Sequence, residues 1–171
     1  MYQMIRNGHL ANLGYEGFPA DAGLYYTALK ATGFHRDEDE AGWRFTTPSI
    51  NNAKNEGVWW MWSATKEQIK TATNHVSMAD IYAAWAAPPY GVRAGVMPIF
   101  ALAFYLASKS ELALYVDGVF TPDLTEAVVD EWLQDPRRIR LKYVAASKDQ
   151  KRLVKAIADS VSIQPRGQTA L

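Results

Sequence analysis

The clearest pattern in the chain is an apolar run in its second half. Residues 94–107, AGVMPIFALAFYLA, are almost entirely apolar, and the polar residues 108–110 end the run. A helix that is apolar on every side must be covered by its neighbours. We therefore expect this segment to form a central, buried helix that begins at Gly95 or Val96. Pro98 is compatible with such a helix because it lies in the first turn, where its missing N–H has no helical partner.

The segments around this run predict a helix-turn-helix followed by a β-hairpin wing. Helices are predicted upstream over residues 58–73 and 77–87, and strands downstream over 112–116 and 119–120. Ser77 followed by Asp80 resembles a capping box with Asp in place of Glu, and Asp117-Gly118 is typical of a tight hairpin turn. The order of these elements predicts a mainly helical α+β protein with a winged-helix-like domain over residues 56–145.

The hairpin is followed by a predicted helix and a predicted strand. The helix starts after Thr121 or Asp123 as its N-cap. Residues 138–144 alternate apolar and basic side chains, which is the period of a half-exposed strand. A last helix is predicted over 147–161, within a C-terminal segment of residues 146–171.

Residues 1–55 show a weaker pattern, and we expect them to pack on this domain as a helical and irregular segment. The predicted elements are the end of a helix over 1–12, a helix between Asp21 and Gly33, a polar loop over 35–42 and a short strand over 43–47. A polar stretch and a loop mark a seam near residue 55. The irregular start leads us to expect that the chain is a piece of a larger protein.

The composition narrows the class of protein. Of the 171 residues, 49% are hydrophobic and 21% charged, which is ordinary for a folded globule, and 18 basic residues balance 18 acidic ones. Cysteine is absent, which excludes disulfides and thiolate metal sites and fits a reducing compartment. The apolar run is shorter than the roughly 20 residues that cross a bilayer, and the start lacks a secretion signal. We expect a soluble, cytoplasmic protein without a membrane partner.

Five basic residues are candidates for contact with nucleic acid. Arg93 and Lys109 stand at the two ends of the apolar helix. Arg138, Arg140 and Lys142 fall on one face of the predicted strand, where they could follow a row of phosphates. The apolar side chains of the central helix offer no base readout. The alternative for the strand, which we favour at this point, is that it is an edge strand whose charges prevent edge-to-edge aggregation.

No motif in the sequence predicts catalysis. The chain contains neither the Walker pattern nor a Gly-x-Ser-x-Gly elbow, and His9, His35 and His75 lie far apart. The acidic residues 37–40 beside His35 lack the ligand spacing of a calcium loop, so a solvated loop is expected there. We therefore expect no enzyme activity in this chain, no catalytic or metal-ligating residue, and no cofactor.

Several stretches, taken in order, resemble a known group of proteins. They are GYEGFP (14–19), LKATGFHR (29–36), GWRF (42–45), APPYG (87–91), GVMP (95–98), LALY (112–115) and DGVFTP (117–122). Together they resemble the region C-terminal to the ATPase core of large, poorly characterised bacterial P-loop ATPases, some of which resemble components of BREX-type phage-defence systems. The resemblance implies that the nucleotide-binding residues lie outside this chain, so that no catalytic position is carried over.

Three hypotheses of function follow. The first, and the favoured one, is a non-catalytic accessory, regulatory or protein-interaction module of a larger bacterial ATP-binding protein, with the remainder of that ATPase or another protein as its partner. The second is a DNA-binding winged-helix domain that contacts phosphates through its basic strand. The third is an enzyme of unrecognised type built around His35 and the acidic loop.

Overall fold

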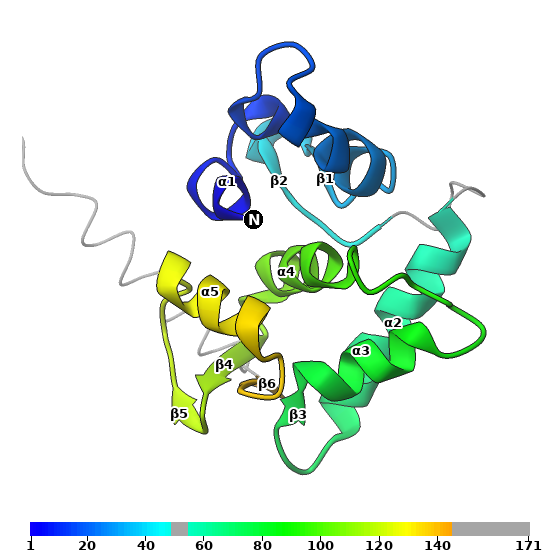
Figure 1. Cartoon of the computed structure of the whole chain (residues 1–171), viewed down its shortest axis with the longest axis vertical. Helices are drawn as coiled ribbons and strands as arrows, with labels where there is room; N and C mark the ends of the chain where they lie inside the picture. Colours follow the sequence, from blue (N-terminus) through cyan, green and yellow to red (C-terminus); the bar gives the residue numbers. More distant parts are fainter. Residues whose placement is uncertain (49–54, 145–171) are drawn as a thin grey trace, which may run out of the picture.

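The computed structural model describes residues 1–48 and 55–144 of the chain, which form an α+β fold as predicted (Figure 1). At its centre lies α4 (Met97–Ser108), the predicted apolar helix, with Pro98 in its first turn. Its side chains are buried on most sides, and Leu102 and Phe104 are 0% and 1% exposed. The prediction of a central, covered helix is thus confirmed. None of the helices in the described residues is long and apolar enough to cross a membrane.

Two helices pack against one side of α4, joined to it by the predicted turn. They are α2 (Glu56–Thr71) and α3 (Met78–Ala86). The Ser77 hydroxyl caps α3 by accepting a hydrogen bond from the Ala79 N–H at 3.1 Å, as the sequence predicts. The two helices are tied together in the core by the Trp85 indole N–H, which donates to the Thr65 hydroxyl at 2.7 Å.

A four-stranded antiparallel sheet covers the adjacent side of the core. Its strands are β3 (Val76–Ser77), β4 (Leu112–Val116), β5 (Val119–Phe120) and β6 (Ile139–Tyr143), in the spatial order β3-β6-β4-β5. Asp117 and Gly118 both have positive φ and form the predicted hairpin turn between β4 and β5. One face of β6 is buried through Ile139 and Leu141, and the other face carries exposed residues, which confirms the predicted alternation.

The prediction that the basic strand lies at a sheet edge is wrong. β6 pairs with β3 on one side, where Val76 is in register with Leu141, and with β4 on the other, where Leu114 is in register with the same residue. The error arose because β3 contains two residues, too few for its alternation to be visible in the sequence. β6 is therefore a central strand.

The helix after the hairpin begins later than predicted. α5 (Glu126–Gln134) has Thr125 as its N-cap, with the Thr125 hydroxyl accepting from the Val128 N–H at 3.4 Å. The Thr121 N–H instead donates to the Leu114 carbonyl. This bond extends the hairpin, so the helix begins further along the chain. Trp132 of α5 is buried and donates its indole N–H to the Tyr82 hydroxyl of α3 at 2.9 Å.

Residues 1–48 form a layer on the side of α4 opposite to α2, α3 and the sheet (Figure 1); we call it the N-terminal layer. Its elements are α1 (Tyr2–Arg6), η1 (Ala11–Gly14), η2 (Ala20–Ala22), η3 (Tyr25–Lys30), β1 (His35–Asp37), η4 (Asp39–Ala41) and β2 (Trp43–Phe45). The ring of Phe34 lies 5.0 Å from those of Trp62 and of Phe100. These contacts join the layer to α2 and α4 in one hydrophobic core.

Two predictions for the N-terminal layer are corrected. The polar stretch after Gly33, predicted to be a loop, contains β1, which pairs antiparallel with β2 so that His35 is in register with Phe45. The predicted helix after Asp21 is replaced by short 3-10 and π-helical turns. The predicted helix over 147–161 lies outside the described residues, and the seam near residue 55 stays a prediction.

Candidate functional site

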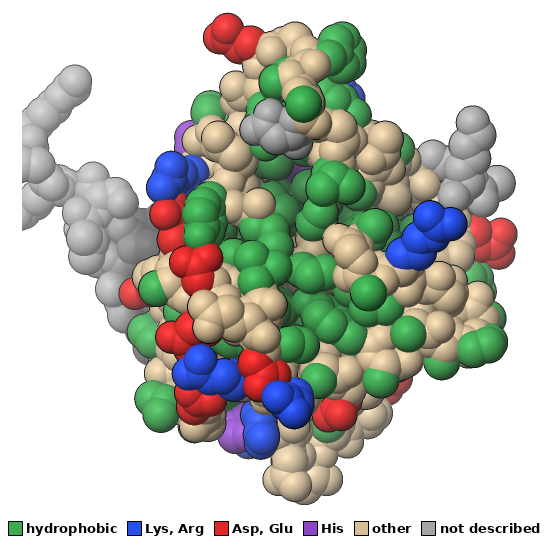
Figure 2. All heavy atoms as spheres, viewed as in Figure 1, with side chains coloured by type: hydrophobic (Ala, Val, Ile, Leu, Met, Phe, Trp, Pro, Cys, Tyr) green, Lys and Arg blue, Asp and Glu red, His purple; other side chains and the backbone are tan. Residues whose placement is uncertain are grey.

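The central helix is shielded by its own chain. A helix that reads DNA presents polar side chains to base edges, whereas Phe100, Leu102 and Phe104 of α4 are buried. Figure 2 shows that the surface over α4 is mostly apolar, with the charged side chains of this face nearer its margins. The structure thus agrees with the expectation that α4 does not present a polar, base-reading surface.

The structure does not bring the five predicted basic residues together. Arg93 precedes α4 and Lys109 follows it, both exposed. A helix of 12 residues spans about 18 Å at 1.5 Å per residue, so Arg93 and Lys109 cannot both contact one phosphate. Arg138 lies one residue before β6 and forms ion pairs with Asp117 and with Glu131. The hydrogen bond from Arg138 lowers the pKa of Asp117, and the charge of Arg138 is thereby matched within the protein.

Arg140 and Lys142 remain on the solvent side of the sheet, beside a row of aromatic rings. In β6 both are exposed, and Arg140 is in register with Tyr115 of β4. The ring of Tyr115 lies 4.1 Å from the ring of His75 and 5.8 Å from that of Phe120. Because β6 separates β3 from β4, the His75 and Tyr115 rings meet over β6. We call these five residues the outer sheet face.

The two cations of the outer sheet face have no ion-pair partner among the residues that the structure describes. Sequence reasoning found Arg140 and Lys142 through their alternation with apolar residues. It missed His75, Tyr115 and Phe120. Tyr115 and Phe120 lie in predicted strands, but their position beside the basic residues depends on strand order, which the sequence does not display.

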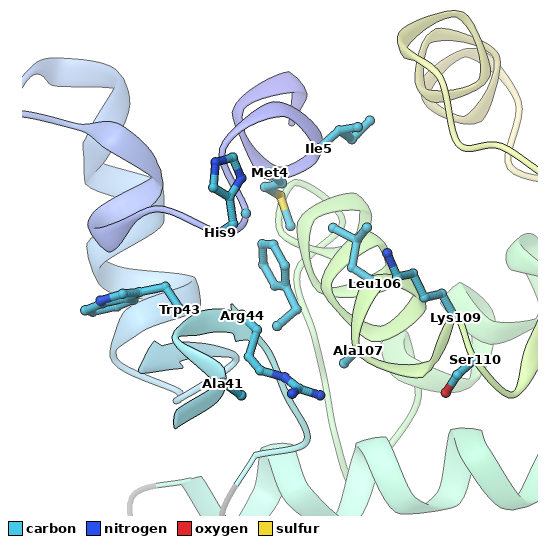
Figure 3. Close-up of a pocket in the computed structure, with 12 residues that line it drawn as sticks. Met4, Ile5, His9, Ala41, Trp43, Arg44, Leu106, Ala107, Lys109 and Ser110 are labelled. Carbon is cyan, nitrogen blue, oxygen red and sulfur yellow. The ribbon is translucent and has the colours of Figure 1, made fainter. Parts of the chain in front are cut away.

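A second surface lies between the N-terminal layer and the C-terminal end of α4 (Figure 3). It is a cleft of about 450 Å³, which we call the interlayer cleft. Its lining residues are Met4, Ile5, Gly8, His9, Ala41, Trp43, Arg44, Phe45, Leu106, Ala107, Lys109 and Ser110. Figure 3 shows Arg44 reaching from β2 toward α4, and Lys109 extending from the end of α4 toward the N-terminal layer. Sequence reasoning selected Lys109 for another role and missed Arg44.

A third surface is a groove of about 520 Å³ at the N-terminal end of α2. It is lined by Gly57, Val58, Trp60, Met61, Pro89, Tyr90, Val92 and Phe100, none of which is charged. Trp60 is 53% exposed beside it. We call this hollow the Trp60 groove.

The residues of the third hypothesis do not converge on a site. His35 is 0% exposed, with Nδ1 3.1 Å from the Tyr25 hydroxyl and Nε2 2.9 Å from the Gly8 carbonyl, whereas Asp39 and Glu40 are exposed. Burial lowers the pKa of His35. Within residues 1–48 and 55–144, no group of three or more His, Asp or Glu side chains could hold a metal ion. His35 is a structural residue in this geometry.

Comparison of the chain with protein-family models, curated proteins and solved structures finds no match. The resemblance to the region beyond the core of bacterial P-loop ATPases therefore stays a prediction.

Proposed function

We propose that the chain is a non-catalytic accessory module that binds single-stranded nucleic acid on its outer sheet face. The observation that carries this proposal is the position of Arg140 and Lys142 on one face of β6, where Arg140 is in register with Tyr115, whose ring contacts that of His75. Protection of a sheet edge, the alternative that the sequence favours, does not account for Arg140, which is paired on both sides, with Ser77 of β3 and Tyr115 of β4. The outer sheet face therefore supports the binding role more strongly than the sequence does.

The chemistry of the outer sheet face matches an unpaired strand. Cations track the phosphates, and exposed rings stack with bases whose faces are free. Phe120 is 56% exposed at one end of the row, so it offers a stacking surface without rearrangement. A duplex keeps its bases stacked on one another, and α4 is covered where a groove-reading helix would be needed. The proposal therefore replaces duplex DNA by single-stranded DNA or RNA.

We further propose that residues 55–144 are a winged-helix-type unit with an insertion. The support is the order α2, β3, α3, α4, β4, β6, with β6 paired between β3 and β4. In this interpretation β5 and α5 are inserted in the loop between β4 and β6. The N-terminal layer covers the helix that would otherwise face DNA.

The nucleic-acid role is tested by reversing the charges of Arg140 and Lys142. We expect Arg140→Glu with Lys142→Glu to weaken binding of a fluorescein-labelled 12-mer of mixed sequence at least about tenfold, measured by fluorescence anisotropy. For two phosphate contacts the slope of log affinity against log salt is about −1.4, so affinity falls about sevenfold between 50 and 200 mM salt. DNA and RNA versions of the 12-mer identify the preferred strand.

Matched variants make this result specific to the outer sheet face. Phe120→Ala, which removes an exposed ring, is expected to weaken binding several-fold through lost stacking. Arg93→Glu reverses an exposed charge elsewhere and should leave the affinity unchanged. Absence of binding at 50 mM salt, equal loss in Arg93→Glu, or a preference for the duplex would overturn the proposal.

A second candidate function is the protein-interaction role expected from the sequence, with the remainder of a larger ATP-binding protein as partner. Its support is the Trp60 groove, whose lining among the described residues is uncharged and which has an exposed Trp at its side. Trp is enriched at the centres of protein interfaces. An apolar, uncharged peptide segment would suit this lining. Trp60→Ala is then expected to weaken binding to that partner at least about tenfold, measured by calorimetry, while oligonucleotide affinity is retained. Unchanged partner affinity would contradict it.

A further inference from the structure

The interlayer cleft is lined by two basic side chains whose charges no acidic residue described in the structure matches. Arg44 and Lys109 enter it from opposite sides (Figure 3). Among the residues that the structure describes, none lining the cleft is acidic, and neither cation forms an ion pair. An anion in the cleft would therefore meet positive charge and no opposing carboxylate among the described residues.

The position of Arg44 is unfavourable in the free protein. In the β1–β2 hairpin it is directly opposite Arg36, and like charges at paired positions are destabilising. Arg36 is matched by its ion pair with Glu38 and donates to the Thr47 carbonyl at 3.1 Å. Arg44 has no such partner among the described residues, so a bound anion would supply the missing charge.

The remaining lining of the cleft is mostly apolar, with His9 and Ser110 as its polar side chains. Phe45 and Trp43 lie against the buried His35 ring, at 4.8 and 5.3 Å between centroids. A Cβ added to Gly8 would lie 2.8 Å from the Met4 carbonyl oxygen and 3.1 Å from the Phe45 ring. Gly8 thus allows the close contact between the residues that follow α1 and Phe45 of β2, which forms one wall. A rigid apolar wall with a few polar groups is the composition of small-molecule sites.

We propose that the interlayer cleft binds a small ligand that combines one anionic group, a carboxylate or a phosphate, with an apolar or aromatic body. Arg44 pairs with the anionic group, Lys109 adds a second positive charge from the other side of the cleft, and the side chains of Met4, Phe45 and Leu106 contact the body. The volume of about 450 Å³ falls within the roughly 300–1,000 Å³ of ligand pockets. This site is separate from the outer sheet face and does not depend on nucleic-acid binding.

Three naphthalene compounds test the two halves of this proposal. 1-Naphthyl phosphate and 1-naphthoate carry the anionic group on an aromatic body, and 1-naphthamide is their uncharged counterpart. Titrated into the full chain and followed by calorimetry, at least one of the two anions should bind at least about tenfold more tightly than the amide, because only the anions form charge-assisted hydrogen bonds with the cations. The tighter of the two anions identifies the headgroup.

Variants then locate the binding. Arg44→Gln should weaken binding of the tighter anion about tenfold and Lys109→Gln by a smaller factor, and Arg44→Lys should recover part of the loss caused by Arg44→Gln. Arg93→Gln removes an exposed charge at the other end of α4 and serves as the control. Lys109 also offsets the negative end of the α4 dipole, so a purely structural role would lower the Tm of Lys109→Gln without changing its affinity.

Any one of three outcomes would overturn the proposal. They are no binding of either anion at millimolar concentration, equal affinity for the amide, or unchanged affinity in both Arg44→Gln and Lys109→Gln. Near-identical circular dichroism spectra of the variants would show that the fold is retained. Loss of oligonucleotide binding in Arg140→Glu with Lys142→Glu, with anion binding intact, would separate this site from the outer sheet face.

Discussion

Replacing Phe34 by Ala is expected to lower the free energy of unfolding by about 3–5 kcal/mol, the usual cost of removing a buried aromatic ring. Phe34 is 0% exposed and lies between the rings of Trp62 and Phe100. The substitution removes both ring contacts and leaves a cavity where the N-terminal layer meets α2 and α4. Urea denaturation followed by tryptophan fluorescence measures the change.

Phe18→Ala is the matched control for this prediction. Phe18 is 88% exposed, so its loss should change stability by no more than about 0.5 kcal/mol. If Phe34→Ala were no more destabilising than Phe18→Ala, the N-terminal layer would not be packed on α4 as the structure describes. Hydrogen exchange in Phe34→Ala should also rise first in residues 1–48, because the lost contacts hold this layer in place.

Local patterns account for the parts of the fold that the sequence predicted well. The burial of α4 follows from an apolar run with no polar face, and the turn at Asp117 and Gly118 follows from the positive φ that the hairpin requires of both residues. Ser77 caps α3 with its own side chain. Each of these features depends on residues within a few positions of one another, so the sequence displays it directly.

Features that depend on distant pairing were missed or misplaced. β1 (His35–Asp37) is largely polar, and it becomes a strand because β2 pairs with it and because His35 is buried. The central place of β6 depends on β3, which lies more than 60 residues earlier. Neither fact leaves a periodic signal, since each arises from tertiary contacts rather than from local alternation.

The candidate sites likewise combine features that local patterns display with features that depend on tertiary packing. Arg140 and Lys142 were found from alternation within one strand, and the rings beside them come from β4, from β5 and from His75, the residue before β3. Arg44 and Lys109 are 65 positions apart, and they face one cleft because the N-terminal layer folds over α4. The sequence contains the cations of both surfaces but not the packing that makes either of them a site.

His35 connects the stability of the N-terminal layer to pH. His35→Leu should cost about 1–3 kcal/mol for the buried Tyr25 hydroxyl left without a partner, and less for the partly buried Gly8 carbonyl. Since a carbonyl only accepts, Nε2 donates to Gly8 and Nδ1 accepts from the Tyr25 hydroxyl. His35→Gln can still donate to Gly8, so a smaller loss is expected from it in urea denaturation at pH 8. Equal stability of His35→Leu and the unmodified chain would contradict the burial of this ring.

The sign of the pH effect follows from the burial of the same ring. Burial lowers the pKa of His35 below its ordinary value of 6.5, and the weaker effect of the Gly8 hydrogen bond opposes it. Below pH 6.5 the unfolded chain binds this proton more readily than the folded one, so the stabilisation is complete above 6.5 and falls as the pH approaches the folded-state pKa. The His35→Gln variant has no titratable group at this position. His9 and His75 are present in both proteins, so the difference between their pH profiles reports on His35 alone. Between pH 8 and pH 5 the unmodified chain should therefore lose more stability than His35→Gln, and parallel losses would show that His35 titrates as in the unfolded chain.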